Sequence, residues 1–211
     1  MILAGTILKV CGITNREDAE AAVEAGATAL GFNFYPRSPR YIAPELAAGI
    51  GAGLPVKRVG VFVNEAREQV AGIAVLAGLD VVQLHGDEPP ADYPAGIAIW
   101  KAARVSEGFD LAAWRDCPAD ALLLDGPAGL LYGGAGRAFD WRVAAACGRK
   151  IILAGGLDAA NVREAIEQAR PWGVDACSRI EIAPGRKDHR KMTDFIQAAR
   201  EAFAARAALS C

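Results

Sequence analysis

The sequence predicts an α/β protein, a single closed (β/α)₈ barrel of the TIM-barrel type that spans residues 1–211. Eight short runs of Val, Ile, Leu and Ala recur along the chain, and unbroken apolar runs are typical of parallel strands buried on both faces. A helical segment follows each run. Eight such units suit a closed barrel better than an open sheet, whose two edges would need covering. The length lies near the lower limit for this barrel, which predicts short loops and no appended domain.

The first strand and helix carry the clearest signals. Residues 7–14 read ILKVCGIT, which predicts a buried strand that runs into a glycine turn. Thr14 and Glu17, three residues apart, predict a capping box for a helix over residues 16–25, and Gly26 predicts the end of that helix. This unit therefore delivers Cys11 to the C-terminal end of the first strand.

The remaining units repeat this pattern. Pro44 suits the first turn of a helix that ends near Ile50, and Gly78 ends a helix over residues 67–77. The other predicted strands cover residues 29–34, 58–63, 81–84, 97–102, 121–125, 150–154 and 174–177. The other predicted helices lie near Pro90, over residues 111–117, from near Trp141, over 161–169 and over 188–207.

Composition excludes several classes of function. A net charge of −2 and a pI near 5.8, with Lys and Arg scattered along the chain, argue against a nucleic-acid partner. The N-terminus lacks the pattern of a signal peptide, and no stretch approaches 18 apolar residues, so we expect no membrane segment. Five cysteines without a CxxC pair and only two histidines argue against a disulfide framework and a metal site. These features favour the cytoplasm.

Isolated polar residues mark the strand face that we expect to line the barrel interior, because neighbouring residues on each strand are apolar. Convergence of several such groups at the C-terminal ends of the strands predicts an active site there. Taken singly, each has a simpler explanation: Cys11 could be a small buried hydrophobic residue, and His85 could hydrogen-bond a loop. The predicted inward polar residues are Lys9, Cys11, Asn33, Arg58, Gln83, His85, Lys101, Asp125 and Asp175.

Two glycine-rich segments lie near the predicted site. Gly155 and Gly156 precede a helix that Asp158 or Asn161 could cap, and Ser178 follows the neighbouring strand; this is where the barrel often holds a phosphate. A plain tight turn would explain the glycine pair equally well. The loop after the sixth strand contains Gly133, Gly134 and Gly136, which fits either a lid over the barrel or a flexible connection.

Taken together, the motifs resemble those of the phosphoribosylanthranilate isomerase family. The matching segments cover nearly the whole chain in order: KVCGIT, GFNFYPRSPRYI, RVGVFVNE, VVQLHGDE, LLLD with GGAGRAFDW, LAGGLDAANV and GVDACSRIEIAPGRKD. The resemblance implies a cofactor-free monomeric or homodimeric barrel enzyme of tryptophan biosynthesis. Its reaction is an intramolecular aldose–ketose (Amadori) rearrangement of the small molecule N-(5-phosphoribosyl)anthranilate to 1-(2-carboxyphenylamino)-1-deoxyribulose 5-phosphate.

The resemblance also implies residue roles. Asp125 would be the general acid that opens the ribose ring, and Cys11 the general base that removes the proton from C2′. This chemistry asks for a Cys11 thiolate, favoured by a cation such as Lys9, and for a desolvated Asp125 with a raised pKa. Arg40 matches the arginine that holds the anthranilate carboxylate. The predicted substrate-binding residues are Arg40, Gln83, His85 and Asp175, and the predicted phosphate-binding residues are Gly155, Gly156, Ser178 and Arg179.

One departure from the family pattern concerns Arg179, which stands where the family usually has glycine. An arginine there either replaces backbone contacts to phosphate with a charge-assisted one or points outward. Two alternatives to the main prediction remain open. They are the related aminosugar isomerase of histidine biosynthesis, which uses two aspartates, and a non-catalytic paralogue that binds a phosphorylated metabolite.

Overall fold

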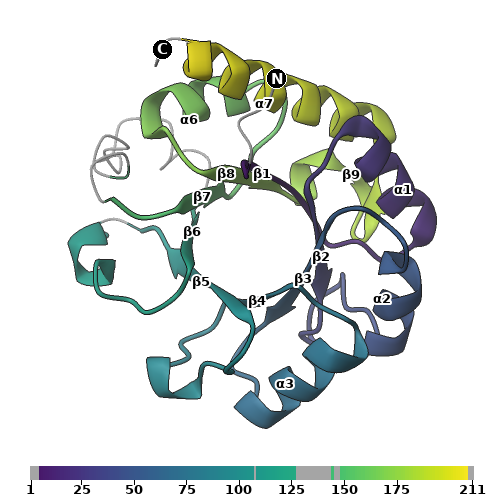
Figure 1. The fold of residues 1–211 in the computed structure, drawn as a ribbon. Coiled ribbons are helices and arrows are strands. Elements are labelled where there is room, and N and C mark those ends of the chain that lie inside the picture. Colours follow the sequence, from purple (N-terminus) through teal and green to yellow (C-terminus); the bar gives the residue numbers. More distant parts are fainter. Residues whose placement is uncertain (1–4, 107, 127–143, 145–147, 209–211) are drawn as a thin grey trace.

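The chain folds into a closed barrel of eight parallel strands with helices around its outside, which confirms the predicted fold class (Figure 1). The structure is a computed structural model that describes residues 5–106, 108–126, 144 and 148–208. Neighbouring strands pair in chain order, and the last strand pairs with the first, so the sheet has no free edge. The strands are β1 (Ile7–Cys11), β2 (Ala29–Asn33), β3 (Lys57–Phe62), β4 (Val81–Leu84), β5 (Ala98–Arg104), β6 (Ala121–Asp125), β7 (Ile151–Ala154) and β8 (Gly173–Ala176).

The helices cover the outer face of the barrel (Figure 1). The long helix α7 packs against both α1 and α6 and so lies along the join between β8 and β1. The α-helices are α1 (Arg16–Ala25), α2 (Pro44–Gly51), α3 (Arg67–Leu76), α6 (Val162–Ala169) and α7 (His189–Ala208). Short 3₁₀ turns η1 (Pro90–Asp92), η2 (Leu111–Trp114) and η3 (Ser178–Ile180) and the small hairpin of β9 (Glu181–Ala183) and β10 (Arg186–Lys187) complete the described elements.

Alternation of side chains along the strands divides the core into two layers. The outer layer packs between sheet and helices and includes Leu8, Val10 and Phe32, as predicted. The inner layer fills the barrel and includes Val59 and Trp100. A shift of one residue in any strand would exchange the two layers, so burial on both sides fixes the strand register and the residues that reach the barrel mouth.

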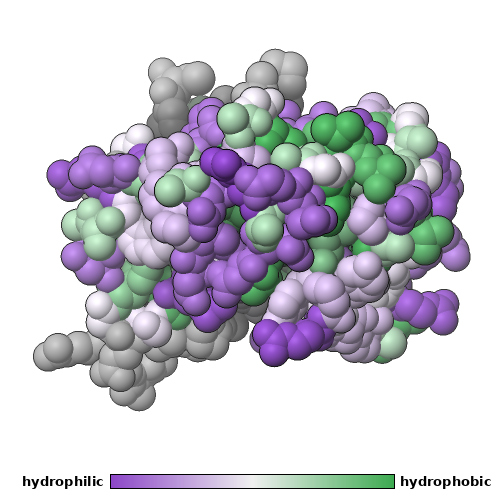
Figure 2. Space-filling view, turned by 90° about the horizontal axis from the view of Figure 1, so that it is seen from below, coloured by the Kyte–Doolittle hydropathy of each residue, from purple (hydrophilic) through white to green (hydrophobic). Residues whose placement is uncertain are grey.

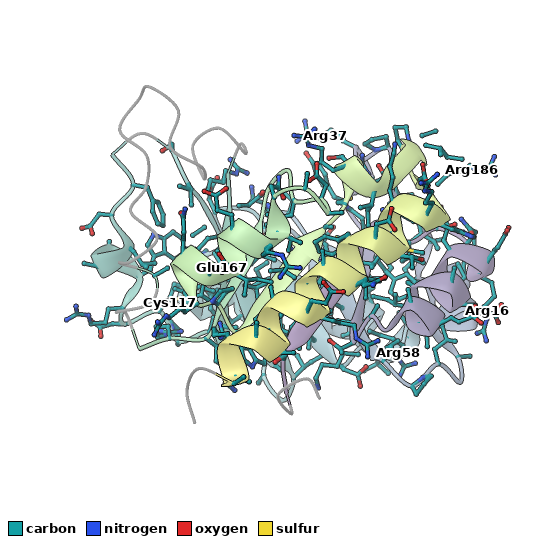
Figure 3. The ribbon with its side chains drawn as sticks, turned by 90° about the horizontal axis from the view of Figure 1, so that it is seen from above. Arg16, Arg37, Arg58, Cys117, Glu167 and Arg186 are labelled. Atoms are coloured by element: carbon teal, nitrogen blue, oxygen red, sulfur yellow. The ribbon has the colours of Figure 1, made fainter. Side chains whose placement is uncertain are left out.

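Two of the predicted inward residues lie elsewhere. The interior positions of β3 are Val59 and Val61, and Arg58 packs outside the barrel near Gly51 and Gly78. Figure 3 shows Arg37, from the loop after β2, and Arg58 at opposite ends of the barrel. The polar character of Arg58 favours an inward position, but its neighbour Val59 has the interior parity.

Lys101 also lies on the outer parity, because Trp100 and Ala102 fill the interior of β5. Its Nζ donates hydrogen bonds to the backbone oxygen of Gly86 (2.6 Å) and to Glu88 Oε2 (2.7 Å). Glu88 in turn accepts a hydrogen bond from the backbone N–H of Gly86. Lys101 is therefore buried with a paired charge and fixes the loop that follows β4.

The predicted N-terminal cap of α1 differs from the one in the structure. Thr14 does not cap α1; its hydroxyl donates to the backbone oxygen of Gly185. Asn15 is the N-cap, and its Oδ1 accepts from the Asp18 backbone N–H (2.8 Å). Gly26 ends the helix as predicted, with φ of 106°. The helix predicted from Trp141 and the glycines at 133, 134 and 136 lie outside the described residues.

The surface seen from the side of α3 is largely hydrophilic, with hydrophobic side chains gathered on one part of it (Figure 2). Val75 and Leu76, at the end of α3, are among the exposed large hydrophobic residues. Within the described part of the chain, we find no helix with the length and apolarity that crossing a bilayer requires.

Candidate active site

A cavity of about 240 Å³ opens at the C-terminal ends of the strands. All ten predicted site residues line it: Cys11, Arg40, Gln83, His85, Asp125, Gly155, Gly156, Asp175, Ser178 and Arg179. The other lining residues are Asn33, Val61, Ala154, Leu157 and Cys177. Residues from distant parts of the sequence thus meet at one mouth of the barrel, at the position where this fold carries its chemistry.

One side of the cavity holds a chain of three polar side chains. Gln83 Nε2 lies 3.1 Å from His85 Nδ1, and His85 Nε2 lies 3.1 Å from Asp125 Oδ2. An amide nitrogen can only donate, so His85 Nδ1 accepts and the Nε2–H of the neutral ring donates to Asp125. His85 therefore fixes one oxygen of the Asp125 carboxyl group, and the other oxygen has no hydrogen-bond partner among the described residues.

Cys11 lies on the other side of the cavity, one layer above a buried ion pair. The Lys9 ammonium donates to Asp175 Oδ2 at 2.7 Å, and both side chains are almost fully buried. A Cβ on Gly31 would lie 2.7 Å from Cys11 Sγ and 3.1 Å from Lys9 Cε. The absence of a side chain at Gly31 therefore leaves the room in which the sulfur and the ammonium approach each other.

The Lys9 ammonium group thus interacts with two acidic groups, Asp175 and Cys11. Burial alone would lower the pKa of Lys9, but attraction to Asp175 and Cys11 outweighs burial and raises it. Burial raises the pKa of Asp175 to about 7 despite Lys9, and the nearby Cys11 and Asp125 add to the rise. Near neutral pH, Asp175 and Cys11 therefore compete for the same positive charge.

The Cys11 thiol has a pKa well below its ordinary value. The largest cause is a hydrogen bond from Cys177, and the positive charges of Lys9 and Lys187 act in the same direction against burial. The same hydrogen bond, together with burial, raises the pKa of Cys177. Of the two sulfurs, Cys11 is the one whose surroundings favour the thiolate form.

A third group of charges surrounds Arg40. Its Nε donates to both carboxylate oxygens of Glu181, and its Nη2 donates to Glu181 Oε2 at 2.6 Å. Lys187 Nζ donates to Glu181 Oε1 (2.8 Å) and to the backbone oxygen of Cys11 (2.6 Å). Glu181 therefore ties the guanidinium group to the end of β1. Arg40 Nη1 has no hydrogen-bond partner among the described residues and lies on a side chain that lines the cavity.

The fourth part of the site is the glycine pair after β7. Gly155 and Gly156 have φ of 91° and 67°, and a Cβ on Gly155 would collide with the backbone of Gly126. Asn161 Nδ2 donates to the backbone oxygen of Gly156 (2.8 Å) and so holds this turn in place. Arg179 lies at the rim, half exposed, with its Nε 3.7 Å from Asp158 Oδ2.

Comparisons with known proteins identify the family. Residues 8–198 match the family model described as N-(5'-phosphoribosyl)anthranilate (PRA) isomerase. The chain belongs to this family. It is 62% identical to N-(5'-phosphoribosyl)anthranilate isomerase of Solibacter usitatus over 94% of this chain and the full length of that relative. The predicted isomerase of tryptophan biosynthesis is thereby confirmed, and the histidine-pathway alternative loses its support.

Solved structures of PRA isomerases have the same fold. That of Thermotoga maritima superposes with a TM-score of 0.83 at 43% identity, covering 93% of this chain and 99% of that one. A second structure, of phosphoribosyl anthranilate isomerase in complex with reduced 1-(o-carboxyphenylamino)-1-deoxyribulose 5-phosphate, gives a TM-score of 0.82 at 41% identity, again covering 93% and 99%.

One prediction about the PRA isomerase site differs from the structure. The Asp125 side chain was expected to be desolvated, but it is 35% exposed and bound by His85. The buried carboxyl group with a raised pKa is that of Asp175. This difference arises because Asp125 ends its strand at the barrel mouth, whereas Asp175 lies one layer deeper, beside Lys9.

Sequence reasoning missed three residues of the site: Cys177, Glu181 and Lys187. Parity offered a signal for Cys177, because it follows Gly173 and Asp175 at intervals of two on the inward face. No periodicity points to Glu181 or Lys187, which belong to the hairpin beyond β8. Among the described residues, no group of three or more His, Cys, Asp or Glu side chains could hold a metal ion.

Proposed function

We propose that this isomerase converts N-(5-phosphoribosyl)anthranilate to 1-(2-carboxyphenylamino)-1-deoxyribulose 5-phosphate, with Asp125 as general acid and Cys11 as general base. The observation that supports this proposal is that a carboxyl group and an activated thiol line one cavity. They come from β6 and β1, which are three strands apart around the barrel, so a sugar can lie between them.

In the first step, Asp125 gives its proton to the ribose ring oxygen. The C1′–O bond breaks as the anthranilate nitrogen supplies its electron pair, which leaves an open-chain iminium ion and an Asp125 carboxylate. His85 donates its Nε2–H to Oδ2, so Oδ1 is the oxygen that carries the proton. The new carboxylate keeps that hydrogen bond, which stabilises its charge.

In the second step, the Cys11 thiolate removes the proton from C2′. The electron pair of the C–H bond forms the C1′–C2′ double bond and neutralises the iminium nitrogen, which yields an enolamine that tautomerises to the ketone. A thiolate is the form of Cys11 that its surroundings favour. The acid and the base are thus separate groups, each on its own side of the sugar.

The floor of the cavity suits a sugar with hydroxyl groups. Gln83 Oε1 and Asp175 Oδ1 are buried acceptors without a hydrogen-bond partner among the described residues. Buried acceptors of this kind cost free energy unless a donor reaches them. We therefore assign both oxygens to ribose hydroxyl groups, Arg40 to the anthranilate carboxylate, and the Gly155–Gly156 turn with Ser178 and Arg179 to the phosphate.

A fluorescence assay with purified protein tests the proposed reaction directly. The signal of phosphoribosylanthranilate should fall in the presence of the protein, and the chain should restore growth of a tryptophan auxotroph that lacks this isomerase. A protein that folds, binds substrate and leaves its fluorescence unchanged would instead be a non-catalytic paralogue.

Arg40→Lys should raise KM by about tenfold to a hundredfold and change kcat less. A lysine cannot hold both oxygens of Glu181 and still present a nitrogen to the substrate carboxylate. Steady-state kinetics measure the separate effects on KM and kcat. The matched control is Arg37→Lys, the same change in the same loop, where the guanidinium group instead lies over the Tyr35 ring. Equal effects of the two substitutions would contradict the role of Arg40.

Arg179→Ala should raise KM severalfold, and the increase should shrink at high salt because the side chain is half exposed and its charge is screened. Arg179→Lys should retain most of the affinity. The control is Arg163→Ala on the outer face of α6, where the arginine pairs with Glu201. A KM for Arg179→Ala that matches the parent at low salt would show that the arginine points away from the phosphate.

Other predictions concern the setting of the enzyme. Residues 1–211 as one domain, a cytoplasmic location, a monomeric or homodimeric state and the absence of nucleic-acid or membrane partners stay predictions. Size-exclusion chromatography with light scattering would measure the oligomeric state.

A further inference from the structure

The Arg40 side chain reaches from the loop after β2 to the end of β1. Its stem lies against Gly12, where a Cβ would come within 2.6 Å of Arg40 Cδ. Gly12 has φ of 76°, so the turn after β1 takes a glycine for its backbone and leaves room for the arginine at the same point. This contact holds the stem of the side chain. The guanidinium group at its end is oriented by Glu181.

Glu181, the first residue of β9, lies behind Arg40 as seen from the cavity. Its side chain is 4% exposed, and it is not one of the described residues that line the cavity. Arg40 Nε donates to both carboxylate oxygens of Glu181 (2.9 and 3.1 Å), and Nη2 donates to Oε2 (2.6 Å). Two nitrogens on one edge of a planar group fix its rotation, so Nη1, on the other edge, is the nitrogen that remains for a ligand.

Glu181 is itself held on its other side by the β9–β10 hairpin. Its Oε1 accepts from Lys187 Nζ (2.8 Å) and from the Gly185 backbone N–H (3.3 Å), and the Cys177 thiol lies 4.0 Å from the same oxygen. Burial alone would raise the pKa of Glu181, but the hydrogen bonds from Arg40 and Lys187 outweigh burial and lower it. Glu181 is therefore a carboxylate at neutral pH.

This carboxylate divides its negative charge between two cations. The Lys187 side chain is fully buried, and its other hydrogen bonds go to the backbone oxygens of Cys11 (2.6 Å) and Cys177 (3.4 Å). Arg40 instead lines the cavity. Arg40 therefore keeps a free donor and part of its positive charge for an anion that enters the cavity.

We propose that Glu181 is a positioning residue that makes Arg40 selective for the anthranilate carboxylate. It holds the guanidinium group with Nη1 toward the cavity, so the loss of side-chain entropy on ordering the arginine occurs on folding, before substrate binds. The substrates favoured are ribosylamine phosphates whose aromatic ring carries a carboxylate. This inference rests on the proposed assignment of Arg40 to that carboxylate. Glu181 itself touches no substrate atom.

Glu181→Gln addresses this role because it keeps the shape of the side chain. Three donors surround Oε1, namely Arg40 Nε, Lys187 Nζ and the Gly185 N–H, so the amide oxygen should take this position. The amide nitrogen then faces Arg40 Nη2, and two donors meet where a hydrogen bond of 2.6 Å stood. Lys187 keeps its contact with the backbone oxygen of Cys11, so the change falls on the orientation of Arg40.

The first test compares two ligands by isothermal titration calorimetry. One is the reduced product analogue with its carboxylate, and the other is the same molecule with a hydrogen atom in place of the carboxylate. Glu181→Gln should bind the first about tenfold more weakly than the parent does, and the second within about twofold of the parent. Damage to the whole site would weaken the binding of both ligands equally.

The second test measures KM and kcat. Glu181→Gln should raise KM by about tenfold and change kcat by less than about threefold, because the acid and the base are untouched. The control is Glu201→Gln, the same change in an exposed carboxylate that pairs with Arg163 on the outer face of the barrel. It should leave both affinities and both kinetic constants unchanged.

Glu181→Asp provides a second variant that keeps a negative charge beside Lys187. Its carboxylate is one methylene shorter and cannot reach both Arg40 nitrogens, so the carboxylated analogue should bind about threefold more weakly and the other analogue as in the parent. Equal losses for the two ligands in Glu181→Gln would overturn the inference. Parental affinity for both ligands in Glu181→Gln or in Glu181→Asp would also overturn it.

Arg40→Lys separates this inference from the proposed function. It should lose the preference for the carboxylated analogue, and adding Glu181→Gln to it should weaken binding little further, because both changes remove the same interaction. An Arg40→Lys protein that kept the preference would overturn the assignment of Arg40 and this inference with it. A parent protein that binds with the expected preference but leaves the substrate unconverted would overturn the proposed reaction and leave the role of Glu181 standing.

Discussion

Asp125→Asn should lower kcat by about 10²- to 10⁴-fold and leave KM within a few fold of the parent. The carboxamide has nearly the shape of the carboxyl group and can still accept the Nε2–H of His85, so the cavity should keep its form. It cannot deliver a proton to the ring oxygen. Ring opening would then depend on solvent, and the loss would fall on the chemical step instead of on binding. Steady-state fluorescence kinetics give both constants.

The matched control for this substitution is Asp80→Asn. Asp80 accepts a hydrogen bond from the backbone N–H of Arg58 and precedes β4, at the opposite end of the barrel from the cavity. The two variants undergo the same chemical change, so they separate loss of the acid from a general effect of removing a carboxylate. If Asp125→Asn kept a near-parental kcat, Asp125 would not be the acid. The next group to test would be Asp175, whose pKa of about 7 leaves it partly protonated at neutral pH.

The fold could be predicted because its determinants are local and repeat eight times. Apolar runs, helix caps and turn glycines each leave a mark on a few neighbouring residues, and eight repeats of the same unit leave few alternatives to a closed barrel. Errors occurred where a polar residue was assigned to the interior by type alone. Lys101 is the clearest case: its partner Glu88 lies outside the sheet, and no local pattern reveals that pairing.

The site was predictable only in part. Side-chain parity and the position of strand ends identified Cys11, Gln83, His85 and Asp125, since the geometry of a strand fixes which residues face inward. What the sequence did not reveal was the coupling between them. The desolvated carboxyl group, with its pKa raised to about 7, is that of Asp175, because depth in the barrel decides desolvation, and depth depends on the stagger of neighbouring strands.

Cys11→Ser should lower kcat/KM by about 10²- to 10⁴-fold across the accessible pH range. A hydroxyl group fills nearly the same space but does not ionise near neutral pH, so the step that removes the C2′ proton loses its base. Lys9 would keep Asp175 as its partner, which should preserve the fold. The ordinary pKa of a thiol is about 8.5. The parent should already be active well below that pH, because Cys177, Lys9 and Lys187 lower the pKa of Cys11.

The control for the thiol is Cys117→Ser, which makes the same change in a half-buried cysteine outside the cavity. It should leave kcat and KM unchanged. In the parent, a bound product analogue should slow alkylation of Cys11, whereas alkylation of Cys117 should be indifferent to it. A Cys11→Ser protein with most of its activity would mean that another group takes the C2′ proton. Asp175 would then be the base to test, since removal of the neighbouring negative sulfur lowers the pKa of that carboxyl group and favours its carboxylate form.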